Sequence, residues 1–429
     1  MTDNRYRRLP VGIQSFKVIR EENYLYVDKS DIVWNMVNLG DKYNYLSRPR
    51  RFGKSVLVDT LESYLEGRKD LFEGLKIMQL EKDWKHYPVI RLDMSRGGAN
   101  EETLRSYLNL RFKDYEEKYN ITPDPTAMLA DRFHAIIATA YKQTGLRVAV
   151  LIDEYDSPLQ HSWRTPEHEK CTGVYREVFA ILKADDEYEH FVFITGITKF
   201  TQISLFSVLN NLSNISFTPE YAAICGITEE EIKENFMPEI RQMSEANNWS
   251  VQETHDRLKA YYDGYHFSDD NMVDIYNPYS LVNALKQRKI KNFWASSGAT
   301  SLLPKFVDNA ELRISKFENC SIMRNTLELS DVSGGGAELF LYQSGYLTIK
   351  ESDEFGYILG FPNKEVKQAL YETVLPALAT RSENEIQSLQ ACLYRYLGTG
   401  QIDEAMKSLK ALIADVPYSN KKLASMDME

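Results

Sequence analysis

The sequence contains little cysteine and no long hydrophobic run. Its 429 residues include four cysteines, none of them in a C-x-x-C pair, so the sequence favours neither a zinc site nor a disulfide framework. No apolar run approaches the roughly 18 residues that cross a bilayer, and the first residues lack the apolar core of a signal peptide. We therefore expect a cytoplasmic protein that has no membrane partner.

An excess of positive charge is missing as well. Lysine and arginine total 51 against 62 acidic residues, which gives a formal charge of −11. A dominant nucleic-acid-binding function usually leaves a basic footprint, so the net charge does not support a nucleic-acid partner, although it does not exclude one basic face. Positive charge gathers locally between Lys42 and Lys54, and such a cluster suits a polyphosphate. The length allows about two or three domains.

The basic stretch SRPRRFGKS, residues 47–55, ends like a phosphate-binding loop. That loop pattern is a glycine, four residues and then Gly-Lys-Ser or Gly-Lys-Thr, but here Arg48 occupies the leading glycine position. Residues 42–47 predict a buried strand, and the apolar positions between Val56 and Leu65 predict a helix. A helix start at Lys54 would present free N–H groups and a positive dipole end to phosphates. A chance match in a basic loop remains the alternative.

The rest of the N-terminal half predicts a parallel sheet. Further strands are indicated at residues 88–95, in the run 147–159, at 190–200 and, more weakly, at 214–217, with helices at 101–119 and 126–141. Continuous rather than alternating hydrophobicity is typical of central parallel strands that are covered on both faces. We therefore expect a three-layer α/β P-loop NTPase core whose site lies at the carboxyl ends of the strands.

Acidic residues end the strand within 147–159, as in a Walker B element. Asp153 and Ser55 are the expected Mg²⁺ ligands, and Glu154 is the expected base for the attacking water. Thr195 ends the next strand and is expected to sense the γ-phosphate. Each residue alone also fits a plain structural role, as a solvated strand end or a strand-end threonine. Taken together and in this order, they predict a P-loop NTPase that binds ATP and Mg²⁺.

Several segments resemble the bacterial AAA-ATPase-like family, a branch of P-loop ATPases allied to the STAND and archaeal ATPase groups. They include LPVGIQSFKVIREENYLYVDKS, YLSRPRRFGKSVLVDTL, VAVLIDEYDSPL and ITGITKFTQISLFSVLNNLSNIS, and later CGITEEEI, YYDGYHF, DIYNPYSLVNAL and LFLYQSGYLTI. The resemblance implies that Arg48 is a family trait and that the loop binds the nucleotide through the following residues: Arg48, Pro49, Arg50, Arg51, Phe52, Gly53, Lys54 and Ser55. Each arginine could contact phosphate or pair structurally with neighbouring groups.

Behind the expected ATPase core (residues 1–225) we expect a helical lid at 226–299. Thr228 followed by Glu231 forms a capping-box pattern, and Asn277 with Pro278 predicts a helix start. The turn DGYHF, residues 263–267, predicts packed aromatics at a helix end rather than a catalytic site. A winged-helix-like module is expected at 300–365, with a β-hairpin around ESDEFG, and C-terminal helices at 366–429.

Members of the resembled family commonly continue into a PD-(D/E)XK nuclease domain. Two Glu-x-Lys matches, Glu231–Lys233 and Glu365–Lys367, lack a preceding strand and are expected to be solvated helix or loop charges. We therefore expect no nuclease activity, and we interpret 366–429 as a helical linker towards a missing nuclease domain.

The function that these patterns favour is a Mg²⁺-ATP-dependent switch with slow hydrolysis, in which Glu154, Lys54 and Thr195 carry the chemistry. Its protein partner is unknown. Two alternatives stay open. One is a catalytically inert, nucleotide-binding or structural scaffold, and the other is a DNA-associated regulatory module of a truncated nuclease system.

Overall fold

The centre of the molecule is a five-stranded parallel sheet. The computed structural model describes residues 8–124, 126–200, 211–296, 303, 317–329, 336–378, 388, 391–392, 395–396 and 401–407. The strand order is β2-β3-β4-β1-β5, built from β1 (Tyr43–Ser47), β2 (Val89–Asp93), β3 (Val148–Asp153), β4 (Glu189–Gly196) and β5 (Ser213–Asn214). The strands expected from the sequence are confirmed, although the last is shorter and starts one residue earlier.

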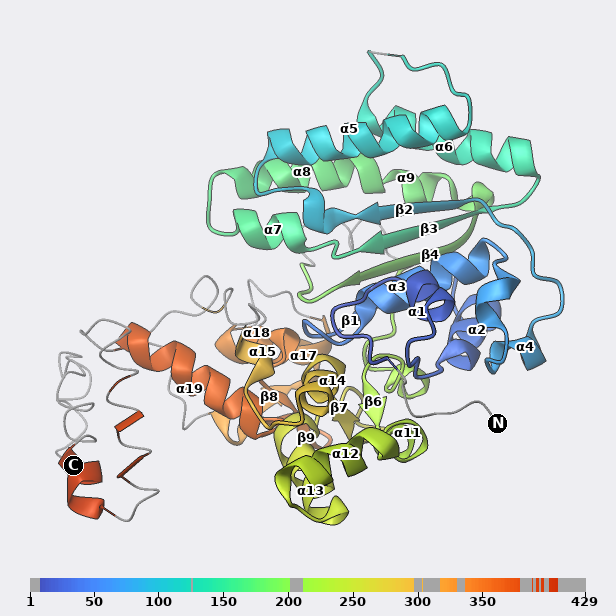
Figure 1. The fold of residues 1–429 in the computed structure, drawn as a ribbon. Coiled ribbons are helices and arrows are strands. Elements are labelled where there is room, and N and C mark those ends of the chain that lie inside the picture. Colours follow the sequence, from blue (N-terminus) through green and yellow to red (C-terminus); the bar gives the residue numbers. More distant parts are fainter. Residues whose placement is uncertain are drawn as a thin grey trace.

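Helices cover both faces of this sheet and make it a three-layer core. Figure 1 shows α5 (Glu101–Lys118), α6 (Leu129–Thr144) and α8 (Glu167–Phe179) on one side, and α1 (Phe16–Glu21), α2 (Ser30–Asn38) and α3 (Lys54–Leu65) on the other. Shorter helices are α4 (Ile77–Leu80), α7 (Ser157–Ser162) and α9 (Ile181–Ala184). Because both faces are covered, every residue of β3 is buried, which explains its continuous hydrophobic sequence. The described helices include none whose length and apolarity would suit a membrane span.

The register of the strands brings three loops together. Ser47, the last residue of β1, pairs with Gly196, the last residue of β4. Asp153 at the end of β3 pairs in the same way with Asp93 at the end of β2. Since parallel strands all end at one edge of the sheet, the segments that follow β1, β3 and β4 leave the core side by side.

A helical region follows the sheet. It contains β6 (Ile227–Thr228), α11 (Glu229–Asn235), α12 (Met237–Asn247), α13 (Val251–Tyr262), β7 (Ile275–Tyr276), α14 (Pro278–Gln287) and α15 (Phe293–Ser296). The capping box of Thr228 and Glu231 is confirmed, as is the start of α14, where the Asn277 side chain accepts a hydrogen bond from Ser280 N. We refer to residues 226–296 as the lid region. It has a hydrophobic core of its own around Ile240, Leu258 and Leu281.

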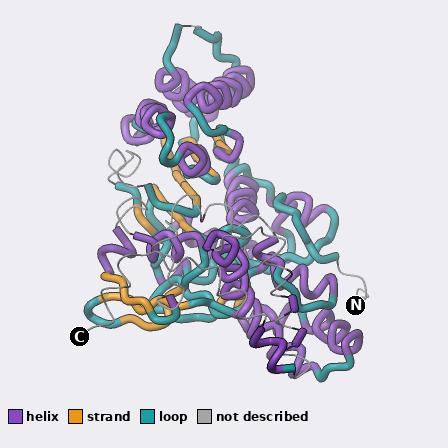
Figure 2. The backbone as a smooth tube through the Cα atoms, turned by 90° about the vertical axis from the view of Figure 1, so that its left-hand side faces the viewer, coloured by secondary structure: helices purple, strands orange, loops and turns teal. Residues whose placement is uncertain are grey.

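The last well-described part combines a small antiparallel sheet with helices. We define the C-terminal module as residues 317–329 and 336–362, which contain β8 (Cys320–Met323), α17 (Arg324–Leu329), α18 (Gly336–Ser344), β9 (Thr348–Ser352) and β10 (Gly356–Gly360) in the sheet order β8-β10-β9. The hairpin expected around ESDEFG is confirmed as β9–β10. Helix α19 (Lys364–Leu378) follows the module. Figure 2 shows that the strands of the five-stranded sheet and those of the three-stranded sheet form separate groups. Apart from α19, the C-terminal helices expected at 366–429 lie largely outside the described residues.

Candidate functional site

The loop between β1 and α3 has a backbone that suits a phosphate. Gly53 directly precedes α3 with φ of 89°, and Arg51 has φ of 70°, so the chain turns through the left-handed region twice before the helix begins. A Cβ built on Gly53 would meet no atom within 4 Å, so the glycine is needed for its backbone angle rather than for space. The result is a free helix N-terminus pointing out of the sheet edge, where an anion is stabilised.

Lys54 ties the two ends of this loop together. Its side chain is buried, and Nζ donates to the carbonyl oxygens of Arg48 and Pro49 at 2.9 and 3.0 Å. Burial lowers the pKa of the Lys54 ammonium, while the charges of Glu154 and Asp153 oppose that shift. The lysine therefore brings a positive charge to the centre of the loop and fixes the loop's first residues around it.

Arg48 supports the loop from behind. Arg48 is 1% exposed, and its guanidinium donates to the carbonyl oxygens of Ser216 at 2.9 Å and Tyr221 at 2.9 Å, as well as to that of Ser47. It also stacks over the Phe267 ring, 4.2 Å from the centroid, and burial lowers its pKa to about 10. These contacts favour the structural role over phosphate contact for this arginine. They also explain how the loop forms without a leading glycine.

The remaining loop residues divide into two groups. Phe52 is buried and packs edge-on against Tyr265, with ring centroids 4.7 Å apart, and against Phe267 at 5.3 Å. Arg50 and Arg51 line the cavity in front of the loop, and the Arg51 guanidinium lies 4.8 Å from the centroid of the Tyr279 ring. Phe52 therefore anchors the loop to the lid region, whereas the two arginines lie at the cavity that a nucleotide would enter.

The two acidic residues that were predicted to end the strand β3 lie against this loop. Asp153 is 3% exposed; burial raises its pKa, while a hydrogen bond with the Ser55 side chain and the charge of Lys54 lower it. Glu154 has φ of 47°, a left-handed conformation that is strained for a glutamate and clusters at functional sites. Burial raises the pKa of Glu154 also, with the positive charge of Lys54 opposing that shift. The structure thus brings Lys54, Ser55, Asp153 and Glu154 together.

The Ser55–Asp153 pair suits a magnesium ion. Hydroxyl and carboxylate oxygens are the hard donors that Mg²⁺ prefers, and this ion is usually held by one or two protein groups together with phosphates and water. Among the described residues there is no group of three or more His, Cys, Asp and Glu side chains arranged to hold a metal. Two protein donors are compatible with this ion, because phosphates and water can complete its shell.

Thr195 lies under the loop rather than at the cavity. Its hydroxyl is buried and donates to the Leu46 carbonyl oxygen at 2.8 Å, across the β1–β4 pair in which these two residues are Cα partners. The predicted γ-phosphate contact would require this hydroxyl to leave that carbonyl. Its sensing role stays a prediction.

A third acidic residue, to which the sequence assigned no role, joins the turns after β3 and β4. Asp156 is 1% exposed, and its Oδ2 accepts hydrogen bonds from the backbone N–H groups of Ile197 and Thr198 at 3.0 and 2.6 Å and from the Thr198 hydroxyl at 2.7 Å. The signal for it was present in DEYD, where an acid follows two residues after Glu154. Asp156 therefore holds the exit of β4 against the turn that carries Glu154.

A cavity of about 420 Å³ opens in front of the loop. Several parts of the chain line it, among them Pro10–Gln14, Arg50–Leu57, Glu154, Ile224–Ile227, and Tyr279, Val282 and Asn283 of α14. Lys29 also lines it and forms an ion pair with Glu231 of the lid region at 2.6 Å. The N-terminal segment and α14 both lie in stretches that resemble the family, but the sequence did not assign either of them to the nucleotide site, because no charged or metal-binding group marks them there. Together they contribute apolar side chains, such as Val11, Ile13 and Val282, and the polar side chains of Gln14 and Asn283.

The two Glu-x-Lys matches turn out to be structural, although the expectation that no strand precedes them is wrong: β6 precedes Glu231 and β10 precedes Glu365. Glu231 belongs to the capping box and pairs with Lys29. Glu365 was expected to be a solvated charge, and that expectation is wrong. The residue is 1% exposed, and its Oε1 accepts hydrogen bonds from the backbone N–H groups of Phe293 and Trp294 at 2.6 and 2.9 Å. It caps the start of α15, which the sequence could not show because the two segments are about 70 residues apart.

The DGYHF turn also proves structural, as expected. Helix α13 ends at Tyr262, Tyr265 and Phe267 are buried against the phosphate loop, and His266 Nε2 lies 2.8 Å from an Asp274 oxygen. The turn therefore connects the lid region to the loop.

Comparisons with solved structures give weak likenesses. The Aeropyrum pernix ORC1 protein, solved in complex with DNA, is 13% identical with a TM-score of 0.29, over 79% of this chain and 89% of that one. CDC6P from Pyrobaculum aerophilum is 12% identical with a TM-score of 0.24, over 88% of this chain and 97% of that one. With scores this low, neither likeness supports an argument about function.

Comparisons of sequence are more informative. The family model AAA-ATPase_like, described as "Predicted AAA-ATPase", matches residues 10–206, which include the whole phosphate loop and the strands β1 to β4. An uncharacterised protein encoded in the 5′ region of vnfD in Azotobacter chroococcum mcd 1 is 32% identical over 398 residues, which are 89% of this chain and 74% of the relative. The similarity thus extends through the lid region and the C-terminal module, and the chain belongs to the AAA-ATPase-like family.

Proposed function

We propose that this protein binds ATP together with Mg²⁺ in the cavity in front of the phosphate loop and hydrolyses it slowly, as a nucleotide-dependent switch. One observation carries the proposal: the 420 Å³ cavity is lined by both the phosphate loop, including Lys54 and Ser55, and by Glu154. A phosphate chain placed on the N-terminus of α3 would therefore have a cation, a metal-binding hydroxyl and an acidic base within one space.

The binding roles follow from the lining of the cavity. Lys54 and the N–H groups at the start of α3 would hold the phosphates, with Arg50 and Arg51 on the same side. The base and ribose would lie between residues 10–14 and the face of α14 on which Val282 and Tyr279 line the cavity. This placement brings the lid region onto the nucleotide, so that occupancy of the cavity and the position of the lid region depend on one another.

The catalytic roles rest on the acidic pair. Ser55 and Asp153 would hold Mg²⁺, which in phosphoryl transfer neutralises charge on the phosphate oxygens. Glu154 would accept a proton from the attacking water. Its pKa is raised by burial, and an upward shift brings a carboxylate closer to the neutral range in which a general base is most effective. Its strained backbone is compatible with a side chain that is held in place for chemistry.

The test is a direct binding titration. We expect ATP to bind the wild-type protein in the presence of Mg²⁺, and Lys54→Ala to weaken binding by at least about tenfold, which corresponds to about 1.4 kcal/mol. Lys69→Ala is the matched control, because Lys69 is an exposed lysine outside the cavity lining; this variant should bind like the wild type. Equal ATP binding by wild type and Lys54→Ala, or no binding by either, would contradict the proposal. The second result would favour the structural scaffold.

A further inference from the structure

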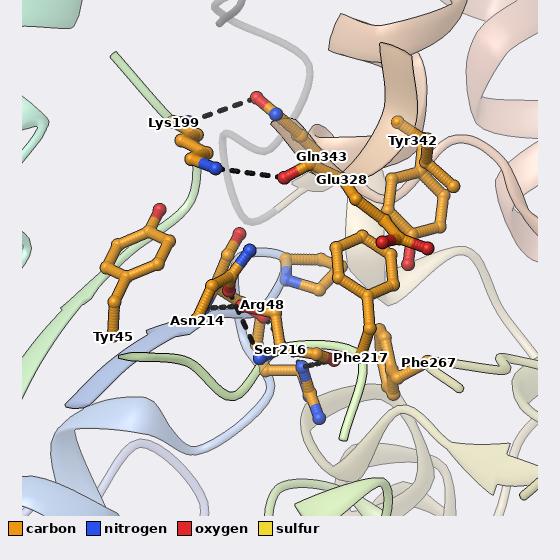
Figure 3. A pocket seen from close by; sticks show the side chains of 13 residues that line it. Tyr45, Arg48, Lys199, Asn214, Ser216, Phe217, Phe267, Glu328, Tyr342 and Gln343 are labelled. Carbon is orange, nitrogen blue, oxygen red and sulfur yellow. Dashed lines mark hydrogen bonds between the residues drawn. The ribbon is translucent and has the colours of Figure 1, made fainter. Parts of the chain in front are cut away.

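The phosphate loop and the exit of β4 both rest on the C-terminal module. Figure 3 shows Lys199 reaching Gln343 and Glu328, with Arg48 and Tyr342 around the same small space. Lys199 follows β4 by three residues, and Arg48 directly follows β1; these strands are neighbours and end as a pair at Gly196 and Ser47. The segments that follow β1 and β4 at the edge of the five-stranded sheet therefore both contact one face of the C-terminal module.

The contact at the phosphate loop is a close one. Gly345, directly after α18, has φ of 90°, and a Cβ built on it would lie 2.6 Å from Pro49 Cβ and 2.9 Å from Pro49 Cγ. Real Cβ atoms do not approach that closely, so no side chain fits between the module and the loop. The Gly345 carbonyl oxygen also accepts a hydrogen bond from the Tyr265 hydroxyl at 3.1 Å, and Tyr265 packs on Phe52 of the same loop.

The contact at β4 is polar and buried. The Lys199 backbone N–H donates to Gln343 Oε1 at 3.1 Å, and its Nζ donates to the Glu328 carbonyl oxygen at 2.9 Å. Gln343 is 6% exposed and Lys199 is 8% exposed. Breaking such bonds leaves buried polar groups without partners, which costs about 1–3 kcal/mol for each group. The module is thus fixed to the core by hydrogen bonds as well as by packing.

The space between these contacts is too small for a ligand. The cavity that Figure 3 shows has a volume of about 30 Å³, which is enough for about one water molecule and far below the size of a small-molecule site. Its residues therefore form a joint between two parts of the chain rather than a second binding site.

The joint reaches the phosphate loop through Lys54. The carbonyl oxygens that hold Lys54 Nζ belong to Arg48 and Pro49, and Pro49 is the residue that touches Gly345. A shift of the module would move Pro49, and with it the acceptors that set the position of Lys54. Nothing in this chain of contacts requires the module to touch the nucleotide.

We propose that Gln343 and Gly345 of the C-terminal module are positioning residues for the phosphate loop, so that nucleotide binding and docking of the module stabilise one another. The inference rests on the proposed function, because it concerns the same nucleotide site. A loop held in its binding conformation does not have to be ordered by the ligand, which raises affinity. By linkage, the nucleotide must favour the docked module by the same factor.

The first test is a pair of glycine variants. Gly345→Ala places a Cβ against Pro49, and we expect it to weaken ATP binding by about tenfold, within the usual range of coupling between sites. Gly145→Ala is the matched control, because Gly145 also has positive φ, 69°, but a Cβ there meets no atom within 4 Å. In both variants an alanine has to adopt a positive φ, which is unfavourable for a residue with a Cβ, so both should lose some thermal stability. Equal ATP affinity in the two variants would overturn the proposal.

The second test does not depend on the folding of Gly345→Ala. Gln343→Leu removes the acceptor for the Lys199 N–H, and we expect it to weaken ATP binding several-fold. In the wild type, ATP with Mg²⁺ should slow hydrogen exchange of amides in α18 and β9, and Lys54→Ala should abolish this protection. If the wild type binds ATP but shows no added protection there, and Gln343→Leu binds normally, the inference is wrong and the proposed function stands. If the wild type does not bind ATP, the proposed function itself fails.

Discussion

Glu365→Gln removes a buried negative charge while keeping the shape of the side chain. The carboxylate lies at the start of α19 and is 1% exposed. Burial raises the pKa of this carboxyl group from 4.5 to about 7, although the hydrogen bonds that it accepts from the N–H groups of Trp294 and Phe293 oppose the shift. Glutamine retains a carbonyl oxygen for these two N–H groups, and its amide can donate towards Ser280, which lies beside the carboxylate. We therefore expect the variant to fold and α15 to keep its cap.

The effect on stability depends on pH. Below about pH 4.5 the group is protonated in both the folded and the unfolded chain. Between pH 4.5 and 7 the unfolded chain loses the proton while the folded chain keeps it, so wild-type stability is lost as pH rises through this window. The shift from 4.5 to about 7, at about 1.36 kcal/mol per unit, gives a loss on the order of 3 kcal/mol above pH 7. Glutamine does not ionise, so the variant escapes this loss.

The assay is urea unfolding of wild type and variant at pH 5 and pH 8. We expect Glu365→Gln to be more stable than the wild type at pH 8, with an advantage on the order of 3 kcal/mol that shrinks to below about 1 kcal/mol at pH 5. Burial also raises the pKa of Asp263 to about 6 and that of Glu189 to about 8, but both groups are present in the two proteins and cancel in the comparison. The same difference at both pH values would refute the reasoning. A gain in wild-type stability with Mn²⁺ that the variant loses would show instead that Glu365 is a metal ligand.

Three further outcomes are expected. Glu154→Gln should keep ATP affinity within about twofold of wild type but lose hydrolysis, because binding and proton transfer are separate tasks; phosphate release at saturating ATP measures this, and unchanged turnover would remove Glu154 from the mechanism. Asp153→Asn should weaken binding with Mg²⁺ more than binding with EDTA, and equal losses would argue against a metal role. Arg48→Met should lower the free energy of unfolding by at least about 2 kcal/mol, since it leaves buried carbonyls unpaired, and a change below about 0.5 kcal/mol would show that the loop does not need this support.

The order of elements in the nucleotide-binding core is readable from the sequence because its signals are local. Buried parallel strands are short runs without alternation, as in β3. In the lid region, likewise, a helix start is marked by a capping side chain within four residues, as at Thr228. The same holds for the positions of Lys54, Ser55, Asp153 and Glu154, since each of these residues stands at or next to a strand or helix end that its own neighbours define. Parallel pairing then brings these ends to one edge of the sheet.

The tertiary structure decides what no local signal contains. Arg48 looks like a phosphate ligand within a basic loop, yet its guanidinium is buried by the carbonyl groups of Ser216 and Tyr221. Glu365 looks like a surface charge on a helix, yet it caps another helix about 70 residues away in the sequence. Pro49 meets Gly345 across nearly 300 residues. Hydrophobic periodicity and capping patterns involve residues only a few positions apart. Whether a polar group can be buried depends instead on which distant segment supplies its hydrogen-bond partners. Only the packing of the whole chain determines which segment that is.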